Sequence, residues 1–170
     1  MHDELMKLSI IKSSKHGKVR DIYDLGDTML LVTSDRISAF DVVFPNLIPD
    51  KGKILNGISV HFFKSTSDIV PNHLISDQVE DYPAELHPFR EYLQGRSMLV
   101  KKTRVIPFEC IVRGYISGSA WAEYKRTNTV GGMMIAEDMQ ESQKFMNPLF
   151  TPSTKAESGH DENISYREML

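Results

Sequence analysis

Alternating and continuous apolar positions predict a largely antiparallel β structure in the first hundred residues. The stretch GKVRDIYDLG, residues 17–26, alternates with a period of two. One strand face then carries Lys18, Arg20 and Ile22, and the other Val19, Asp21 and Tyr23. Residues 25–27 form a turn signal, and the apolar run 28–34 predicts the partner strand of a hairpin. Residues 97–104 predict another strong strand.

One amphipathic helix and one central strand complete the main predicted elements. Residues 53–66 follow a helical period, with Leu55, Ile58, Phe62 and Phe63 expected on the inner side. Residues 105–116 predict a strand whose packed face holds Cys110, Val112, Gly114 and Ile116. Its other face holds Glu109, Ile111, Arg113 and Tyr115, and a helix over 120–126 follows.

These elements predict an α+β protein in two parts. Residues 1–104 form an antiparallel β lobe with a helix, and residues 105–170 begin a second α+β domain. The pair Ser165 and Glu168 has capping-box spacing and predicts a helix start near the last residue of the sequence.

Composition excludes several classes of protein. A chain of 170 residues with 41% hydrophobic content can bury a substantial core. The net charge of −3, with dispersed Lys and Arg, argues against extended nucleic-acid or membrane contact. The single cysteine excludes an internal disulfide. Without a long apolar run or a signal-like start, we expect a cytoplasmic protein.

The strongest candidate chemistry lies around Arg113. Ser117, Gly118 and Ser119 precede the helix over 120–126, so backbone N–H groups and a hydroxyl gather near the arginine. This arrangement fits an anion site, most simply for phosphate. It also fits a plain helix cap, with Arg113 paired to a carboxylate.

A second candidate anion site is the start of the chain's first hairpin. Gly17 allows close backbone approach, and Lys18 and Arg20 point the same way, as in a phosphate-binding turn. Two cations on an edge strand also fit a solvated surface. Lys101 lies beside the connector 105–107, whose backbone groups could bind an adenine edge.

Candidate carboxylates lie in two further stretches. Asp41 stands between apolar residues, so it needs a metal, an amine or backbone N–H groups, unless it forms an Asx turn. His160, Asp161 and Glu162 follow one another in a very polar segment, which is either a solvent loop or a group that meets a metal or an amine.

Four ordered motifs resemble one known family. GKVRDIY, SDRISAFD, VIPFECIVRGYISGS and TPSTKAESGHDENIS are similar to the amino-terminal part of phosphoribosylaminoimidazole-succinocarboxamide synthase, or SAICAR synthetase. The resemblance runs in register from about residue 15 to residue 165. It implies an ATP-dependent ligase of purine biosynthesis with a kinase-like nucleotide lobe. In such enzymes ATP and Mg²⁺ activate the carboxylate of carboxyaminoimidazole ribonucleotide, and the amine of L-aspartate attacks it to form an amide.

The resemblance also implies roles for individual residues. Gly17, Lys18 and Arg20 would contact the ATP phosphates, and Lys101 and Glu109 would hold adenine and ribose. Arg113 and Ser119 would bind the ribonucleotide phosphate. Asp41 and Asp161 would act in catalysis by orienting groups or binding the metal, and His160 would contact substrate. It fixes no metal ligands and leaves a homo-oligomer open.

The sequence departs from the family at its far end. A further family signature with Asp, Lys and Glu has no counterpart here. The chain is therefore expected to act either as the ligase or as a noncatalytic nucleotide-binding fragment of it.

Overall fold

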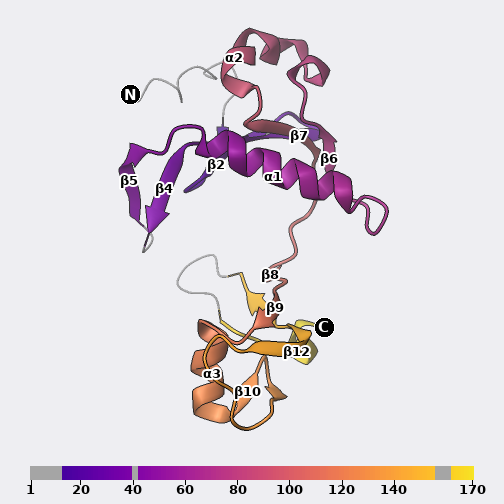
Figure 1. Cartoon of the computed structure of the whole chain (residues 1–170). Coiled ribbons are helices and arrows are strands. Elements are labelled where there is room, and N and C mark those ends of the chain that lie inside the picture. Colours follow the sequence, from indigo (N-terminus) through magenta and orange to yellow (C-terminus); the bar gives the residue numbers. More distant parts are fainter. Residues whose placement is uncertain (1–12, 40–41, 156–161) are drawn as a thin grey trace. The chain divides into compact units, whose positions relative to one another are not determined.

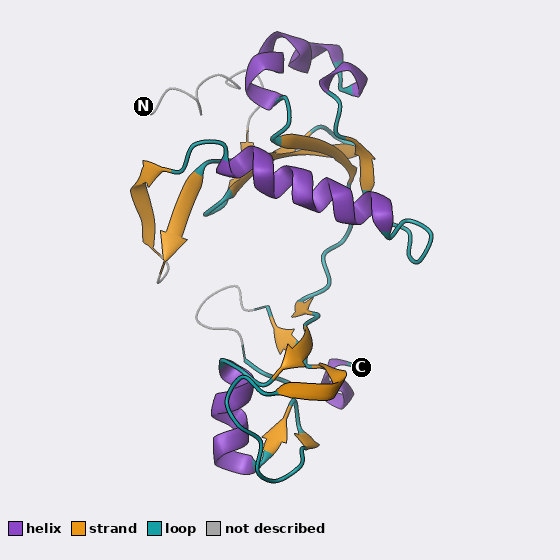
Figure 2. Ribbon diagram, viewed as in Figure 1, coloured by secondary structure: helices purple, strands orange, loops and turns teal. Residues whose placement is uncertain are grey.

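The computed structural model describes residues 13–39, 42–155 and 162–170 (Figure 1). The chain folds as two compact units, residues 1–104 and 105–170. All strand pairs in the described residues are antiparallel, and helices and strands are mixed in both units (Figure 2). The predicted α+β class is confirmed.

The first unit is built on a five-stranded sheet of order β1-β2-β3-β7-β6. The strands of the unit are β1 Ser13–His16, β2 Arg20–Asp24, β3 Thr28–Thr33, β4 Arg36–Ala39, β5 Val42–Leu47, β6 Leu74–Ser76 and β7 Ser97–Lys101. Its helices are α1 Lys51–Ser65, α2 Arg90–Leu93 and the 3₁₀ helices η1 Val79–Asp81 and η2 Ala84–Phe89. The predicted hairpin is confirmed, since β2 pairs with β3 across the turn at 25–27.

Alternating side chains place a core on each face of this sheet. One face packs against η1, η2 and α2, through Tyr23, Leu30, Val32, Leu99, Val79, Tyr82, Leu86 and Leu93. The other face packs against α1, through Met98, Val100, Val60 and the partly buried Met29, Leu31, Phe63 and Leu74. Figure 1 shows α1 crossing one face and the short helices lying over the other.

The register places two candidate residues at opposite ends of the sheet. Arg20 pairs with Thr33 at the end of β3, whereas Lys101 pairs with Thr28 at its start. Five residues of strand separate the two positions, which is about 16 Å at ~3.3 Å per residue.

The expected inner side of α1 is wrong at two positions. Ile58 and Phe62 are 50% and 60% exposed, whereas Gly52, Asn56 and Val60 are buried. The helix lies so close to β3 that only glycine fits at position 52, because an added Cβ would clash with the Thr33 carbonyl oxygen. Asn56 is buried because its amide donates to the carbonyls of Gly95 and Ser97.

The second unit contains short strand pairs around one helix. Its elements are β8 Phe108–Glu109, β9 Val112–Tyr115, α3 Ser119–Thr127, β10 Thr129–Val130, β11 Met133–Met134, β12 Lys144–Phe150, β13 Ser153–Thr154 and α4 Tyr166–Met169. The pairs are β8 with β13, β9 with β12 and β10 with β11. A small core gathers around α3 from Ile116, Ala120, Tyr124, Val130 and Phe145.

The predicted central strand is interrupted, and its packed face is wrong in part. The segment divides into β8 and β9, which pair with different strands. Cys110 and Val112 are exposed, while Ile116 is buried as expected. The capping box of Ser165 and Glu168 is present at the start of α4. Among the described residues, no helix has the length and apolar character to cross a membrane.

Candidate functional site

A tight turn joins β1 to β2 and carries the first candidate residues. The Gly17 N–H donates to the Arg20 carbonyl at 2.8 Å. A Cβ at Gly17 would lie 2.8 Å from the same oxygen, so the turn requires glycine. Lys18 and Arg20 are exposed, and Arg20 donates to the Ser59 hydroxyl of α1 at 3.4 Å. The turn therefore presents two cationic side chains at one end of the sheet.

A buried ion pair lies beneath this turn. The Asp21 side chain is fully buried and accepts two hydrogen bonds from Arg36, at 2.6 Å and 3.1 Å. Arg36 also donates to the carbonyls of Gly17 and Lys18, at 3.0 Å and 3.4 Å. His16 Nδ1 lies 3.1 Å from Asp21 Oδ1. The period of two placed Asp21 on the same strand face as Tyr23 but gave no sign of its partner, which is 15 residues away.

A second ion pair connects the segment after β3 to the residue that precedes β7. Asp35 is paired with Arg96 at 3.2 Å and accepts the Gly52 N–H at 2.7 Å. Burial alone would raise the pKa of Asp35, but the hydrogen bonds from Gly52 and Arg96 outweigh it and hold the pKa below its usual 3.8. The carboxylate therefore stays charged and anchors the start of the helix.

Lys101 lies at the opposite end of the sheet from the turn. It is exposed, and its N–H donates to the His73 carbonyl at 2.8 Å. The next residue, Lys102, binds Asp24 at 2.6 Å, and this hydrogen bond lowers the pKa of Asp24. The following connector, residues 103–107, is exposed.

In the second unit, Arg113 and Ser119 meet at the start of α3. Arg113 donates to the Ser119 hydroxyl at 2.9 Å and to the Thr151 hydroxyl at 3.0 Å. The N-cap of α3 is Gly118, and no described side chain caps the helix. The plain-cap interpretation is therefore wrong, and among the described residues the hydrogen bonds of Arg113 go to hydroxyls. Ser119 is also the first residue of α3, so the guanidinium contacts the residue at which the helix begins.

Glu109 lies on β8 and has an ion pair of its own. Its carboxylate is 3.6 Å from the Lys155 ammonium, and both side chains are about half exposed. The strand pairing of β8 with β13 brings these two residues together.

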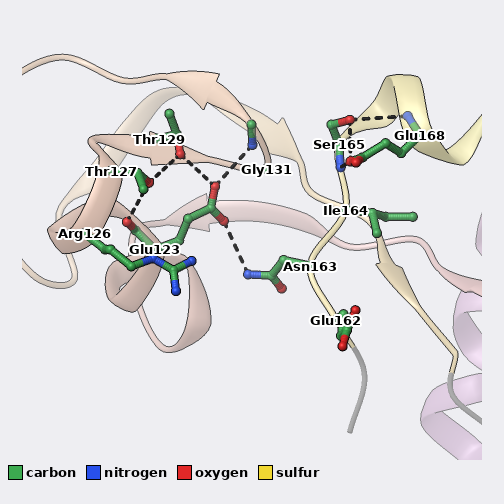
Figure 3. Close-up of a pocket in the computed structure, with 11 residues that line it drawn as sticks. Glu123, Arg126, Thr127, Thr129, Gly131, Glu162, Asn163, Ile164, Ser165 and Glu168 are labelled. Atoms are coloured by element: carbon green, nitrogen blue, oxygen red, sulfur yellow. Dashed lines mark hydrogen bonds between the residues drawn. The ribbon is translucent and has the colours of Figure 1, made fainter.

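A polar pocket of about 560 Å³ lies one helical turn beyond Ser119 (Figure 3). Its hub is Glu123, which accepts hydrogen bonds from Thr129, the Gly132 N–H and Asn163, at 3.0, 3.2 and 3.3 Å. Glu123 therefore connects α3 to the segment after residue 161. Sequence reasoning missed this residue, because its partners lie as far as 40 positions away.

Three predicted site residues, Asp41, His160 and Asp161, lie outside the described residues. Among those that the structure describes, no group of three or more His, Cys, Asp or Glu could hold a metal ion.

Comparisons with known proteins identify the family to which this chain is similar. The family model described as SAICAR synthetase matches residues 13–170. The chain belongs to the SAICAR synthetase family. The phosphoribosylaminoimidazole-succinocarboxamide synthase of Trichlorobacter lovleyi is 58% identical over 161 residues, which cover 94% of this chain and 54% of that protein. The chain thus spans about half the length of the curated relatives it matches.

Solved structures of the SAICAR synthetase family share the fold. The SAICAR synthase of Saccharomyces cerevisiae, solved in complex with SAICAR, is 45% identical with a TM-score of 0.83. That match covers 94% of this chain and 55% of the yeast chain. A type-2 SAICAR synthetase in complex with ADP has a TM-score of 0.66 at 20% identity, and the match covers 91% of this chain and 55% of that one. At 20% identity, the match to the type-2 enzyme shows a shared fold only.

Proposed function

We propose that this chain serves the ATP-dependent ligation of carboxyaminoimidazole ribonucleotide and L-aspartate, which gives SAICAR, ADP and phosphate. The family membership supports this reaction class, and the yeast relative was solved with SAICAR. The observation that carries the proposal is the contact of Arg113 with Ser119 at an uncapped helix start. Such a group of donors suits the phosphate of a ribonucleotide.

Arg113 and Ser119 would hold the ribonucleotide before reaction. The Thr151 and Ser119 hydroxyls orient the guanidinium, so its remaining N–H groups are already fixed when the phosphate arrives. Because α3 begins at Ser119, its positive end adds to the attraction. The reacting carboxylate would then be placed by its distance from the anchored phosphate.

The first unit would bind ATP. The Gly17 turn with Lys18 and Arg20 would contact the phosphates, and Lys101 with the connector after it would contact adenine. These two places lie at opposite ends of one sheet, and the register puts the side chains of Arg20 and Lys101 on opposite faces of it. The adenine contact at the Lys101 end would therefore come from the backbone groups of the connector. By the family resemblance, Glu109 of the second unit would bind the ribose. Asp41, Asp161 and His160 keep the roles that the resemblance implies, as orienting groups and a substrate contact.

Magnesium has no ligand set among the described residues. The described residues would therefore bind and orient the two anions, ATP and the ribonucleotide. The cytoplasm as location, L-aspartate as second substrate and a homo-oligomer as assembly remain parts of the same proposal.

A noncatalytic nucleotide-binding fragment is the second candidate function. The two candidates differ in turnover and share ATP binding.

Calorimetric titration of the chain with Mg-ATP and then with the ribonucleotide tests both. Saturable binding of both ligands supports the proposed sites, and formation of SAICAR on adding L-aspartate decides for the ligase. A folded chain that binds neither ligand would refute both candidates. In a matched titration, Lys18→Ala should weaken ATP and leave the ribonucleotide affinity unchanged, because Lys18 lies at the phosphate turn.

A further inference from the structure

We infer that Arg36 is a positioning residue, which holds the turn from Gly17 to Arg20 in the conformation that binds the ATP phosphates. This inference rests on the proposed function and adds a residue to it. Arg36 lies in the motif SDRISAFD, where the family resemblance implies a role only for the last aspartate.

Arg36 binds carbonyl oxygens of the turn. Its guanidinium makes four hydrogen bonds, two to the buried Asp21 carboxylate and one each to the carbonyls of Gly17 and Lys18. The next carbonyl, that of Val19, accepts from both the N–H and the hydroxyl of Ser34. Three successive carbonyls of the turn thus point toward the chain that leaves β3.

The direction of the carbonyls fixes the direction of the amides. In a trans peptide the N–H points opposite to the preceding carbonyl. The N–H groups of Lys18, Val19 and Arg20 therefore point away from Arg36 and Ser34. Successive N–H groups on one side of a turn form a concave site for anions such as phosphate.

Arg36 itself would not contact the nucleotide. Four of its five N–H donors are in use, and its side chain is 17% exposed. Asp21 is the counter-charge that keeps it in place, and the fork geometry explains why arginine is required. A lysine would keep the charge near Asp21 but could not reach the carboxylate and both carbonyls together.

The test compares Arg36→Lys with Arg96→Lys in the full chain. Both substitutions keep the charge of a largely buried arginine paired with an aspartate, but only Arg36 contacts the turn. Calorimetry with Mg-ATP and with adenosine measures the phosphate and base contributions separately. Hydrogen exchange at residues 17–20, with residues 28–33 as reference, reports on the turn without any ligand.

The expected result is specific to the phosphates. Arg36→Lys should weaken ATP by about ten- to a hundredfold, leave adenosine unchanged and speed exchange in the turn. Arg96→Lys should leave the ATP affinity, the adenosine affinity and the exchange rate in the turn unchanged. If Arg36→Lys does not fold, the double variant Asp21→Asn/Arg36→Met replaces it, because it leaves no lone charge buried.

Three outcomes would overturn the inference. Wild-type ATP affinity in Arg36→Lys would refute the positioning role and leave the proposed function standing. Equal loss of ATP and adenosine would show that Arg36 only stabilises the fold. A folded wild-type chain that binds neither ATP nor adenosine would refute the proposed nucleotide site, and the inference with it.

Discussion

Replacing Arg113 by alanine should abolish most of the affinity for the ribonucleotide and spare that for ATP. The side chain is held by the hydroxyls of Ser119 and Thr151, at 2.9 and 3.0 Å, so its remaining donors are fixed in direction. A hydrogen bond to a charged group contributes about 1.5–3 kcal/mol, so loss of one or two such bonds costs about 3 kcal/mol. At about 1.4 kcal/mol per tenfold, the affinity should fall about a hundredfold.

The assay is calorimetric titration of each ligand, with the melting temperature measured alongside. Arg126→Ala is the matched control, because it removes the same charge from an exposed position near the end of α3. Arg113→Lys should fall between wild type and alanine, since lysine keeps the charge but cannot reach both hydroxyls.

Equal loss of both ligands in a folded Arg113→Ala variant would show that the residue supports the fold and not the phosphate. Unchanged ribonucleotide affinity would show that the ribonucleotide phosphate does not bind at the start of α3. A similar loss in Arg126→Ala would mean that only the net charge of the unit matters.

Three further predictions concern the first unit. Gly52→Ala should destabilise the chain by about 1–3 kcal/mol, because its Cβ would clash with the Thr33 carbonyl oxygen. Gly57→Ala in the same helix is the control: its Cβ meets no atom, so it should stabilise the chain slightly. Urea unfolding of both variants measures the two changes in stability. The pKa of Asp35 lies below its usual 3.8, so its contribution to stability is present above pH 3.8 and is lost as the pH falls through the lowered value. Asp35→Asn should therefore weaken the fall in unfolding free energy at acid pH. An unchanged fall would contradict the lowered pKa. Burial, and to a smaller extent the charge of Arg20, lowers the pKa of His73 below 6.5. Stability should therefore fall as the pH drops from 6.5 through the lowered pKa. His73→Phe should remove this dependence, as measured by unfolding curves between about pH 5 and 7.

The sequence predicted best what depends on near neighbours. The alternation that places Asp21 and Tyr23 on one strand face and Arg20 on the other is confirmed, because a period of two is a local property of the strand. The capping box at Ser165 is also local and is also confirmed. The family resemblance, carried by four short motifs, is confirmed by the match over residues 13–170.

What depends on distant partners could not be predicted. Hydrophobicity alone placed Ile58 and Phe62 on the inner side of α1, whereas the close approach to β3 selects Gly52, and the carbonyls of Gly95 and Ser97 select Asn56. No pattern in a single sequence reports such approaches. The same reason explains why Glu123 was missed.

The register of β3 also decides which residues of the first unit can share a ligand. Arg20 and Lys101 pair with Thr33 and Thr28, so their positions are about 16 Å apart along the strand, at ~3.3 Å per residue. Because Thr28 and Thr33 are an odd number of residues apart, the side chains of Arg20 and Lys101 leave opposite faces of the sheet. A rigid ligand that lies flat on one face can contact only one of these two side chains. Whether two residues of a sheet can share such a ligand thus depends on whether an odd or an even number of strand residues separates them.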